Sequence, residues 1–160
     1  MSTPLDNTFR PQISPPPAVD CADSLTASTR ATTTITTTIL LVEDDRSIRR
    51  YLEVILQRAG YTVIAAADGL EAMKATLSSA IDLIVTDAIM PRLNGYELCR
   101  FVRRHPKLSG LPIVLLSGID HQHQTPPNLS PEMEACADVY LSKPVRPEEL
   151  TNCITRLLPA

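Results

Sequence analysis

The 160-residue chain lacks several features that would assign it to a common functional class. Its net charge of −3 offers no positive field to nucleic acid or anionic lipid. Its apolar runs, such as Ile39–Val42, are far too short to span a bilayer. The amino-terminal end has no continuous apolar segment of signal-peptide length. We therefore expect a cytoplasmic protein with no nucleic-acid partner and no membrane partner.

Two familiar motifs are also absent. The four cysteines, Cys21, Cys99, Cys136 and Cys153, lie far apart without CxxC spacing. We interpret them as reduced thiols and expect three of the four to lie in or near the core. No GxGxxG follows the first predicted strand, so dinucleotide binding has no support.

Residues 1–36 differ in composition from the rest of the chain. They are rich in Pro, Thr, Ser and Ala, with Pro15–Pro17 and Thr32–Thr34 as the clearest patches. Such a segment cannot bury enough apolar area to offset the loss of chain entropy. We predict a disordered tail over residues 1–36, followed by one domain over residues 37–160.

Beyond the tail, short apolar runs alternate with segments of helical periodicity. The predicted strands are Thr38–Glu43, Thr62–Ala66, Ile81–Thr86, Ile113–Leu116 and Val139–Leu141. Apolar residues at helical spacing mark four helices: Ile48, Tyr51, Leu52, Ile55 and Ala59; Leu70, Met73 and Leu77; Leu98, Phe101 and Val102; and Leu150, Cys153, Ile154, Leu157 and Leu158. A further short helix, Pro131 to about Ala137, is predicted after a proline-interrupted stretch.

Strict alternation of strands and helices predicts an α/β fold. Continuously apolar strands indicate a parallel sheet with helices on both faces. Right-handed crossovers then favour a doubly wound, five-stranded sheet of order 2-1-3-4-5, which is the flavodoxin-like order.

The carboxyl ends of the predicted strands carry polar side chains. The first strand runs into Glu43 and Asp44, the third into Asp87, the fourth into Ser117 and the fifth into Lys143. Such groups collect at one edge of an open α/β sheet. Two carboxylates about 4 Å apart repel by roughly 4 kcal/mol at an effective dielectric of 20, so a cation such as Mg²⁺ is expected. The set is typical of phosphoryl transfer, with Asp87 as the nucleophile.

Four motifs resemble the receiver domain of two-component response regulators. They are ILLVEDD (39–45), DAIMPRLNG (87–95), LLSG (115–118) and YLSKP (140–144). The resemblance covers about residues 37–160 and implies the flavodoxin-like receiver fold.

The resemblance also implies a role for each matching residue. Asp87 becomes the phosphoacceptor, and Asp44 and Asp87 become direct ligands of Mg²⁺. Glu43 and the backbone carbonyl of Ile89 complete the metal site on the protein side.

Three further positions follow from the same resemblance. Ser117 is the expected switch hydroxyl, Tyr140 the switch aromatic and Lys143 the phosphate-binding lysine. The peptide bond between Lys143 and Pro144 is expected to be cis.

The sequence departs from the family pattern in three places. Asp45 lies one position beyond the acidic pair, so we assign it to capping the first helix. Cys136-Ala137-Asp138 stands where the family often has Gly-Ala-Asp. The stretch from Ser117 to Lys143 is a few residues longer than usual, which leaves the shape of the fourth helix open.

The leading functional hypothesis is a stand-alone receiver. It would take a phosphoryl group from a histidine kinase or phosphotransfer protein and signal to a downstream effector protein through non-covalent contacts. It would be no enzyme beyond catalysing its own phosphorylation and dephosphorylation. Ile89 and Ile119, each two residues past a site residue, are apolar, so we predict a long-lived aspartyl phosphate.

Two other functions are alternatives to the receiver. A Mg²⁺-dependent phosphatase of the haloacid-dehalogenase type also has an aspartyl nucleophile, but it needs a second Asp two residues on, where this chain has Ile89. A receiver-like adaptor that is never phosphorylated is the other alternative, and the complete set of acids, hydroxyl and lysine argues against it.

Overall fold

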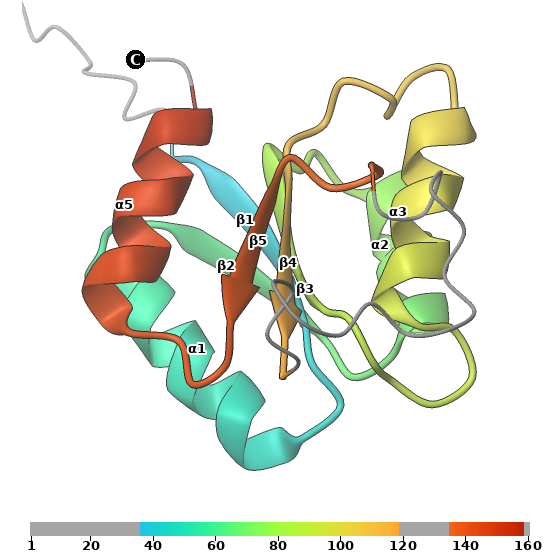
Figure 1. Ribbon diagram of the computed structural model, residues 1–160. Helices are drawn as coiled ribbons and strands as arrows, with labels where there is room; N and C mark the ends of the chain where they lie inside the picture. The colour runs from blue at the N-terminus through green and yellow to red at the C-terminus, as the bar shows by residue number, and fades with distance from the viewer. Residues whose placement is uncertain (1–35, 119–134, 159–160) are drawn as a thin grey trace, which may run out of the picture. The chain divides into compact units, whose positions relative to one another are not determined.

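A computed structural model of the protein describes residues 36–118 and 135–158 (Figure 1). Five parallel strands form one sheet: β1 (Thr38–Val42), β2 (Thr62–Ala66), β3 (Leu83–Asp87), β4 (Ile113–Ser117) and β5 (Val139–Ser142). The helices in the described ranges are α1 (Arg46–Arg58), α2 (Gly69–Ser78), α3 (Gly95–Arg104) and α5 (Pro147–Leu157). The strand order is β2-β1-β3-β4-β5, so the predicted fold class and topology are confirmed.

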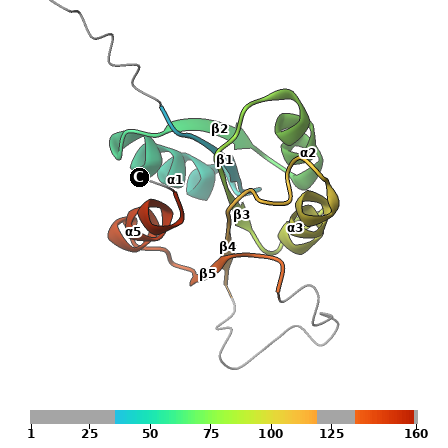
Figure 2. The ribbon, with the colours of Figure 1, turned by 90° about the horizontal axis from the view of Figure 1, so that it is seen from above.

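The sheet lies between two layers of helices. Viewed from above, α1 and α5 cover one face, and α2 and α3 cover the other (Figure 2). Alternate residues of β1 supply the two cores: Leu40 and Val42 pack on the α2/α3 side, whereas Ile39 and Leu41 pack on the α1/α5 side. All four side chains are fully buried, which explains why the strand is apolar at every position.

The predicted strand bounds are nearly correct. β2 has the predicted limits, and β1 ends one residue earlier than predicted, at Val42. β3 begins two residues later and reaches Asp87 itself, while β4 and β5 each extend one residue further, to Ser117 and Ser142.

Helix α1 begins and ends as its sequence indicates. The carboxylate of Asp45 accepts the backbone N–H groups of Ser47 and Ile48 at 2.8 and 2.9 Å, which confirms the predicted cap. Gly60 follows the last turn with φ of 92°, a conformation that glycine adopts without a steric penalty.

The buried faces of α1 and α2 differ from those predicted. In α1 the fully enclosed residues are Leu52 and Leu56, whereas Ile48 and Tyr51 are exposed. In α2 the small residues Gly69, Ala72 and Thr76 face the protein, and Leu70 and Leu77 face outward. Small side chains let α2 approach its neighbours closely, so its large apolar residues are left on the surface.

The other two helices match their patterns. Leu98 and Val102 of α3 are buried, as are Leu150 and Ile154 of α5. Helix α5 starts at Pro147, which needs no N–H partner at that position.

Part of the predicted fourth helix is wrong. Residues Ala135–Ala137 form a turn and a bend rather than the end of a helix. The remainder of that prediction, together with Ile119, lies outside the described residues, as does the predicted tail up to residue 35.

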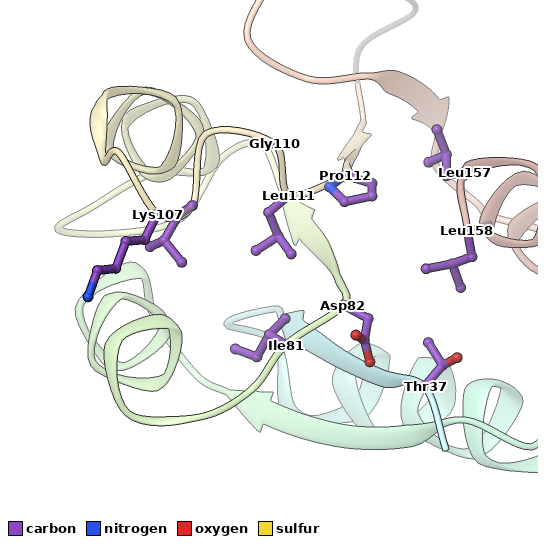
Figure 3. A pocket seen from close by; sticks show the side chains of 10 residues that line it. Thr37, Ile81, Asp82, Lys107, Gly110, Leu111, Pro112, Leu157 and Leu158 are labelled. Carbon is purple, nitrogen blue, oxygen red and sulfur yellow. The ribbon is translucent and has the colours of Figure 1, made fainter. Parts of the chain in front are cut away.

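A cavity of about 810 Å³ opens at the amino-terminal edge of the sheet (Figure 3). Thr37, Asp82 and Pro112 line it, and these residues immediately precede β1, β3 and β4. It therefore lies at the edge opposite the predicted site.

Within the described residues, no helix has the length and apolar character required to cross a membrane.

Candidate phosphoacceptor and metal site

The residues after β1 provide two of the acidic groups. Glu43 is 1% exposed, whereas Asp44 is exposed to solvent. Arg49 of α1 reaches back and donates to the backbone carbonyl of Glu43 at 2.6 Å and to that of Asp44 at 3.2 Å. Because Asp45 caps the helix, its carboxylate is directed to the α1 backbone rather than to the acidic pair. The turn between β1 and α1 is therefore held to α1 by the Arg49 side chain and by the Asp45 cap.

Asp87 is the last residue of β3 and is 7% exposed. Its Oδ1 atom accepts the backbone N–H of Ile89 at 3.3 Å. The backbone at Gly95 then passes very close to the end of β3. A Cβ atom placed on Gly95 would lie only 2.1 Å from the carbonyl oxygen of Asp87. Only glycine fits that approach, so α3 starts close against the strand that carries Asp87.

Two contacts hold the loop between Asp87 and α3. Asn94 and Glu97 form a reciprocal capping box at the start of α3, with both bonds at 2.9 Å. Arg92, which has φ of 71°, pairs with Asp68, the residue that caps α2. The loop is thereby anchored at α2 as well as at α3.

Strands β4 and β5 supply the hydroxyl and the ammonium group. Ser117 ends β4 and is 1% exposed, and its carbonyl accepts the backbone N–H of Lys143 at 2.8 Å. The bond between Lys143 and Pro144 is cis, as predicted. The Nζ atom of Lys143 lies 2.7 Å from Oε2 of Glu43 and 3.1 Å from Oδ2 of Asp87.

The three carboxylates converge on one point. Glu43, Asp44 and Asp87 each offer an oxygen, and these oxygens lie within 4.8 Å of one another. At that distance two carboxylates repel by roughly 3.5 kcal/mol at an effective dielectric of 20. Lys143 supplies one positive charge against three negative ones, so the cluster retains an excess of negative charge. An all-oxygen set of this charge fits a hard divalent cation such as Mg²⁺.

Burial and charge shift two pKa values at the cluster. The pKa of Glu43 is raised, first because burial disfavours the carboxylate and also because Asp87 is nearby, although the hydrogen bond from Lys143 opposes the shift. Burial works against the ammonium form of Lys143, but its hydrogen bond to Glu43 and the charge of Asp87 outweigh burial and raise its pKa. The ammonium group therefore stays charged throughout the neutral range.

A family model for the response regulator receiver domain matches residues 39–155 of the chain. The chain belongs to this family. The matched range includes every residue of the acidic cluster and its lysine, from Glu43 to Lys143.

Known relatives share the receiver region. The transcriptional regulatory protein GltR of Pseudomonas aeruginosa is 37% identical over 120 residues, which are 75% of this chain and 48% of GltR. The chain thus spans about half the length of that relative. Protein PilG of the same organism is 30% identical over 122 residues, which are 76% of this chain and 87% of PilG.

A solved receiver structure has the same fold. The response regulator TrrA of Thermotoga maritima, crystallised in complex with Mg²⁺ and BeF, superimposes with a TM-score of 0.67 at 32% identity. The superposition covers 77% of this chain and all of TrrA, 100% of its length.

The remaining predicted site residues take separate positions in this receiver domain. Tyr140 is half-buried on β5, where it pairs with Leu115 of β4. Its hydroxyl pKa is raised, mainly by burial. The side chain of Ile89 is 56% exposed beside Asp87. The predicted metal contact of the Ile89 carbonyl and the switch roles of Ser117 and Tyr140 stay predictions.

The sequence did not indicate that Arg49 and Arg103 hold loops at opposite edges of the sheet, Arg49 beside the receiver site and Arg103 at the amino-terminal edge. Arg49 fixes the turn that carries the acidic pair, and Arg103 donates to a carbonyl before β5. Arg103 stands in the last turn of α3, where a positive charge is favourable whatever else it contacts. Its partners are up to 35 residues away in sequence, so no local pattern marks them.

Proposed function

We propose that this receiver domain accepts a phosphoryl group on Asp87 from the phosphohistidine of a kinase or phosphotransfer protein, in the presence of Mg²⁺. One observation carries the proposal: the Asp87 carboxylate lies 3.1 Å from the Lys143 ammonium group, and its oxygens converge with those of Glu43 and Asp44. The Mg²⁺–BeF complex of TrrA supports the same chemistry by analogy.

Glu43, Asp44 and Asp87 would hold the metal ion, together with the carbonyl of Ile89. A bound Mg²⁺ would offset the negative charge of the carboxylates and of the incoming phosphoryl group. Such catalysis consists mainly of positioning and charge neutralisation.

The chain's own residues perform the transfer. An oxygen of Asp87 attacks phosphorus, and the phosphorus–nitrogen bond of the phosphohistidine breaks as its electron pair returns to the imidazole. Lys143 stabilises the charge on the phosphoryl oxygens. The Ile89 N–H, 3.3 Å from Oδ1, orients the Asp87 carboxylate for the attack. The domain is in this sense a phosphoacceptor rather than an enzyme acting on other molecules.

Phosphorylation would be read out by a population shift. It adds about −1.5 to −2 charges at the end of β3. Ser117, at the end of the neighbouring β4, would donate its hydroxyl to the phosphoryl group. Tyr140 on β5 would move inward as the β4 end changes. An effector protein would then bind the altered surface.

The test compares two aspartates at opposite ends of one strand. Asp87 ends β3, and Asp82 precedes the same strand, where its Oδ2 accepts the N–H of Thr38 at 2.7 Å. Wild type, Asp87→Asn and Asp82→Asn are incubated with acetyl phosphate or beryllofluoride and Mg²⁺. Intact-mass spectrometry and NMR are expected to show a response in wild type and Asp82→Asn but not in Asp87→Asn. Equal responses from all three proteins would overturn the proposal, and so would a response that EDTA leaves unchanged.

The phosphatase alternative has weaker support. Its general acid would stand two residues after Asp87, and that position holds the apolar side chain of Ile89. Steady release of phosphate from a small phosphoester such as p-nitrophenyl phosphate would favour the phosphatase. Absence of any effect of acetyl phosphate, with Mg²⁺ binding intact, would favour the adaptor.

A further inference from the structure

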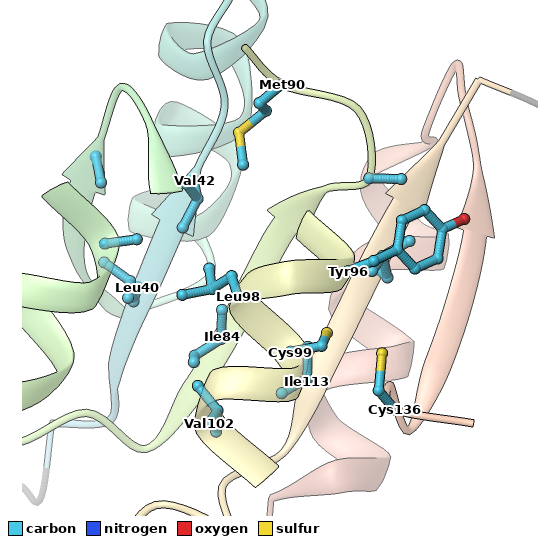
Figure 4. Close-up of a cluster of buried hydrophobic side chains, with 14 residues drawn as sticks. Leu40, Val42, Ile84, Met90, Tyr96, Leu98, Cys99, Val102, Ile113 and Cys136 are labelled. Carbon is cyan, nitrogen blue, oxygen red and sulfur yellow. The ribbon is translucent and has the colours of Figure 1, made fainter. Parts of the chain in front are cut away.

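Two cysteines from distant parts of the chain meet in the α2/α3 core. Cys99 lies on α3, and Cys136 lies in the bend that leads into β5. Their side chains point toward one another (Figure 4), and their thiols are hydrogen-bonded. Neither thiol is in a disulfide, and their exposed fractions are 0% and 5%.

Arg103 holds the two thiols in this arrangement. It follows Cys99 by four residues and therefore lies on the same face of α3. Its Nε atom donates to the carbonyl of Cys136 at 2.9 Å, and one terminal nitrogen pairs with Asp138 at 2.7 Å. The Asp138 carboxylate also accepts the N–H of Ile113 at 2.7 Å, which joins the bend to β4. The backbone from Cys136 to Asp138 is thus tied to α3 and to the sheet.

The two thiols are chemically different. The pKa of Cys136 is lowered, first because its sulfur accepts the S–H of Cys99 and further because it accepts the hydroxyl of Tyr140. The pKa of Cys99 is raised, first because its hydrogen is donated to Cys136 and further by burial. Thiolate character is therefore concentrated on Cys136, which is also the less buried of the two.

We propose that Cys99 and Cys136 are an oxidation site that forms a reversible disulfide with a small peroxide as oxidant. The sulfur of Cys136 attacks one peroxide oxygen, the O–O bond breaks, and a sulfenic acid and one molecule of water are formed from hydrogen peroxide. The sulfur of Cys99 then attacks the sulfenic sulfur. The S–O bond breaks, the hydroxide leaves with the Cys99 proton as a second water, and the S–S bond forms.

The disulfide would change the environment of Tyr140. In the reduced protein the Tyr140 hydroxyl donates to the sulfur of Cys136, which is the more thiolate-like of the pair. A disulfide sulfur is a much poorer acceptor than a thiolate, so this bond is weakened on oxidation. The site thereby links the redox state of the thiols to the tyrosine of β5, independently of whether Asp87 is phosphorylated.

The experiment uses full-length Cys21→Ser/Cys153→Ser protein, which retains only the proposed pair. It is treated with hydrogen peroxide, quenched and denatured, and its free thiols and mass are measured. We expect loss of both thiols in parallel, a mass decrease of two hydrogens, a Cys99–Cys136 cross-linked peptide and full recovery with dithiothreitol. The chain has four tyrosines, so ring-labelled NMR should resolve a shift confined mainly to Tyr140.

Control variants isolate each step. In the same background, Cys136→Ser is expected to slow oxidation of Cys99 by about tenfold or more, because Cys99 lacks thiolate character. A matched protein that keeps Cys153 and lacks Cys136 tests pairing, because Cys153 is also buried but lies in the α1/α5 core. It should form no intramolecular disulfide. Arg103→Lys, which cannot reproduce the full set of contacts, should lower the yield of disulfide relative to sulfinic acid.

Several outcomes would overturn the proposal. They are oxidation of the pair to sulfinic or sulfonic acid without a cross-link, disulfides formed only between chains, and thiols that remain intact while the exposed thiol of glutathione is consumed. Loss of the native circular dichroism spectrum on cross-linking would also overturn it, since the disulfide would then be incompatible with this fold.

Discussion

The two edges of the sheet use the same kind of side chain in different ways. At the amino-terminal edge, Asp82 is exposed and its carboxylate accepts the Thr38 N–H beside a mainly apolar cavity. At the carboxyl-terminal edge, Asp87 is buried among Glu43, Asp44 and Lys143. Asp82 immediately precedes β3, and Asp87 is its last residue. The difference shows that neighbouring charge and burial, rather than the residue type or the strand, make a carboxylate chemically useful.

The two edges should differ most in how much a substitution of glycine destabilises the fold. Gly95→Ala places a Cβ atom 2.1 Å from the Asp87 carbonyl, whereas a Cβ on Gly110, beside the amino-terminal cavity, meets nothing within 4 Å. We expect Gly95→Ala to lower the free energy of unfolding by about 3 kcal/mol or more and Gly110→Ala to change it by less than about 0.5 kcal/mol. Urea denaturation measures both, and similar effects at the two glycines would contradict the packing described here.

The next largest difference between the two edges should come from removing the charge of an aspartate. Without metal, Asp87→Asn removes repulsion from two carboxylates but also one ion pair with Lys143, so we expect stabilisation by about 1–2 kcal/mol. Asp82→Asn weakens a structural hydrogen bond and should destabilise by about 1 kcal/mol. Melting curves in EDTA test the signs. In Mg²⁺, wild type and Asp82→Asn should gain stability, and Asp87→Asn should gain little. A destabilised Asp87→Asn protein in EDTA would show that Lys143 more than balances the cluster.

The raised pKa of Glu43, at the carboxyl-terminal edge, predicts that the free energy of unfolding depends on pH. A carboxyl group whose pKa is higher in the folded state favours folding when protonated, and this contribution is lost as pH rises from the unfolded value through the folded one. In EDTA, Glu43→Gln should therefore gain stability relative to wild type as pH rises from about 4 to 7. Differential scanning fluorimetry across this range measures the difference, and a constant difference would refute the assignment. Mg²⁺ affinity should fall as Glu43 becomes protonated.

The smallest effect concerns the lifetime of the phosphorylated state. The exposed apolar side chain of Ile89 lies beside Asp87 and offers no hydrogen bond to an attacking water. Ile89→Asn should speed loss of phosphate about fivefold, which corresponds to about 1 kcal/mol in activation free energy. The decay of purified phosphoprotein is followed by phosphate-affinity electrophoresis, with Ile89→Val as the control. The idea fails if wild type loses its phosphate within seconds or if Ile89→Asn decays no faster.

Much of the fold and site could be predicted because their signals are local. Apolar runs located all five strands to within two residues. Because parallel strands end at the same edge of a sheet, Asp87, Glu43 and Lys143 were expected to lie close together. The observed distances agree with that expectation, since Lys143 lies within 3.1 Å of both carboxylates.

The parts that were missed depend on distant contacts. Periodicity located α2 but not its buried face, because Leu70 and Leu77 look like core residues until Ala72 is seen against the sheet. Likewise, nothing in the sequence around Arg103 shows that its carbonyl partner, Cys136, lies 33 residues further on.

The contact between Lys143 and Glu43 has a consequence for how the protein folds. The two residues are 100 positions apart, on opposite sides of β3 and β4 in the sheet order. Closing so long a loop is slow, and the contact exists only after the last strand has docked. The acidic edge is therefore completed at the end of folding, and a chain whose β5 is still undocked holds three carboxylates with no lysine between them. The cluster of Glu43, Asp87 and Lys143 is thus complete only when the sheet is finished.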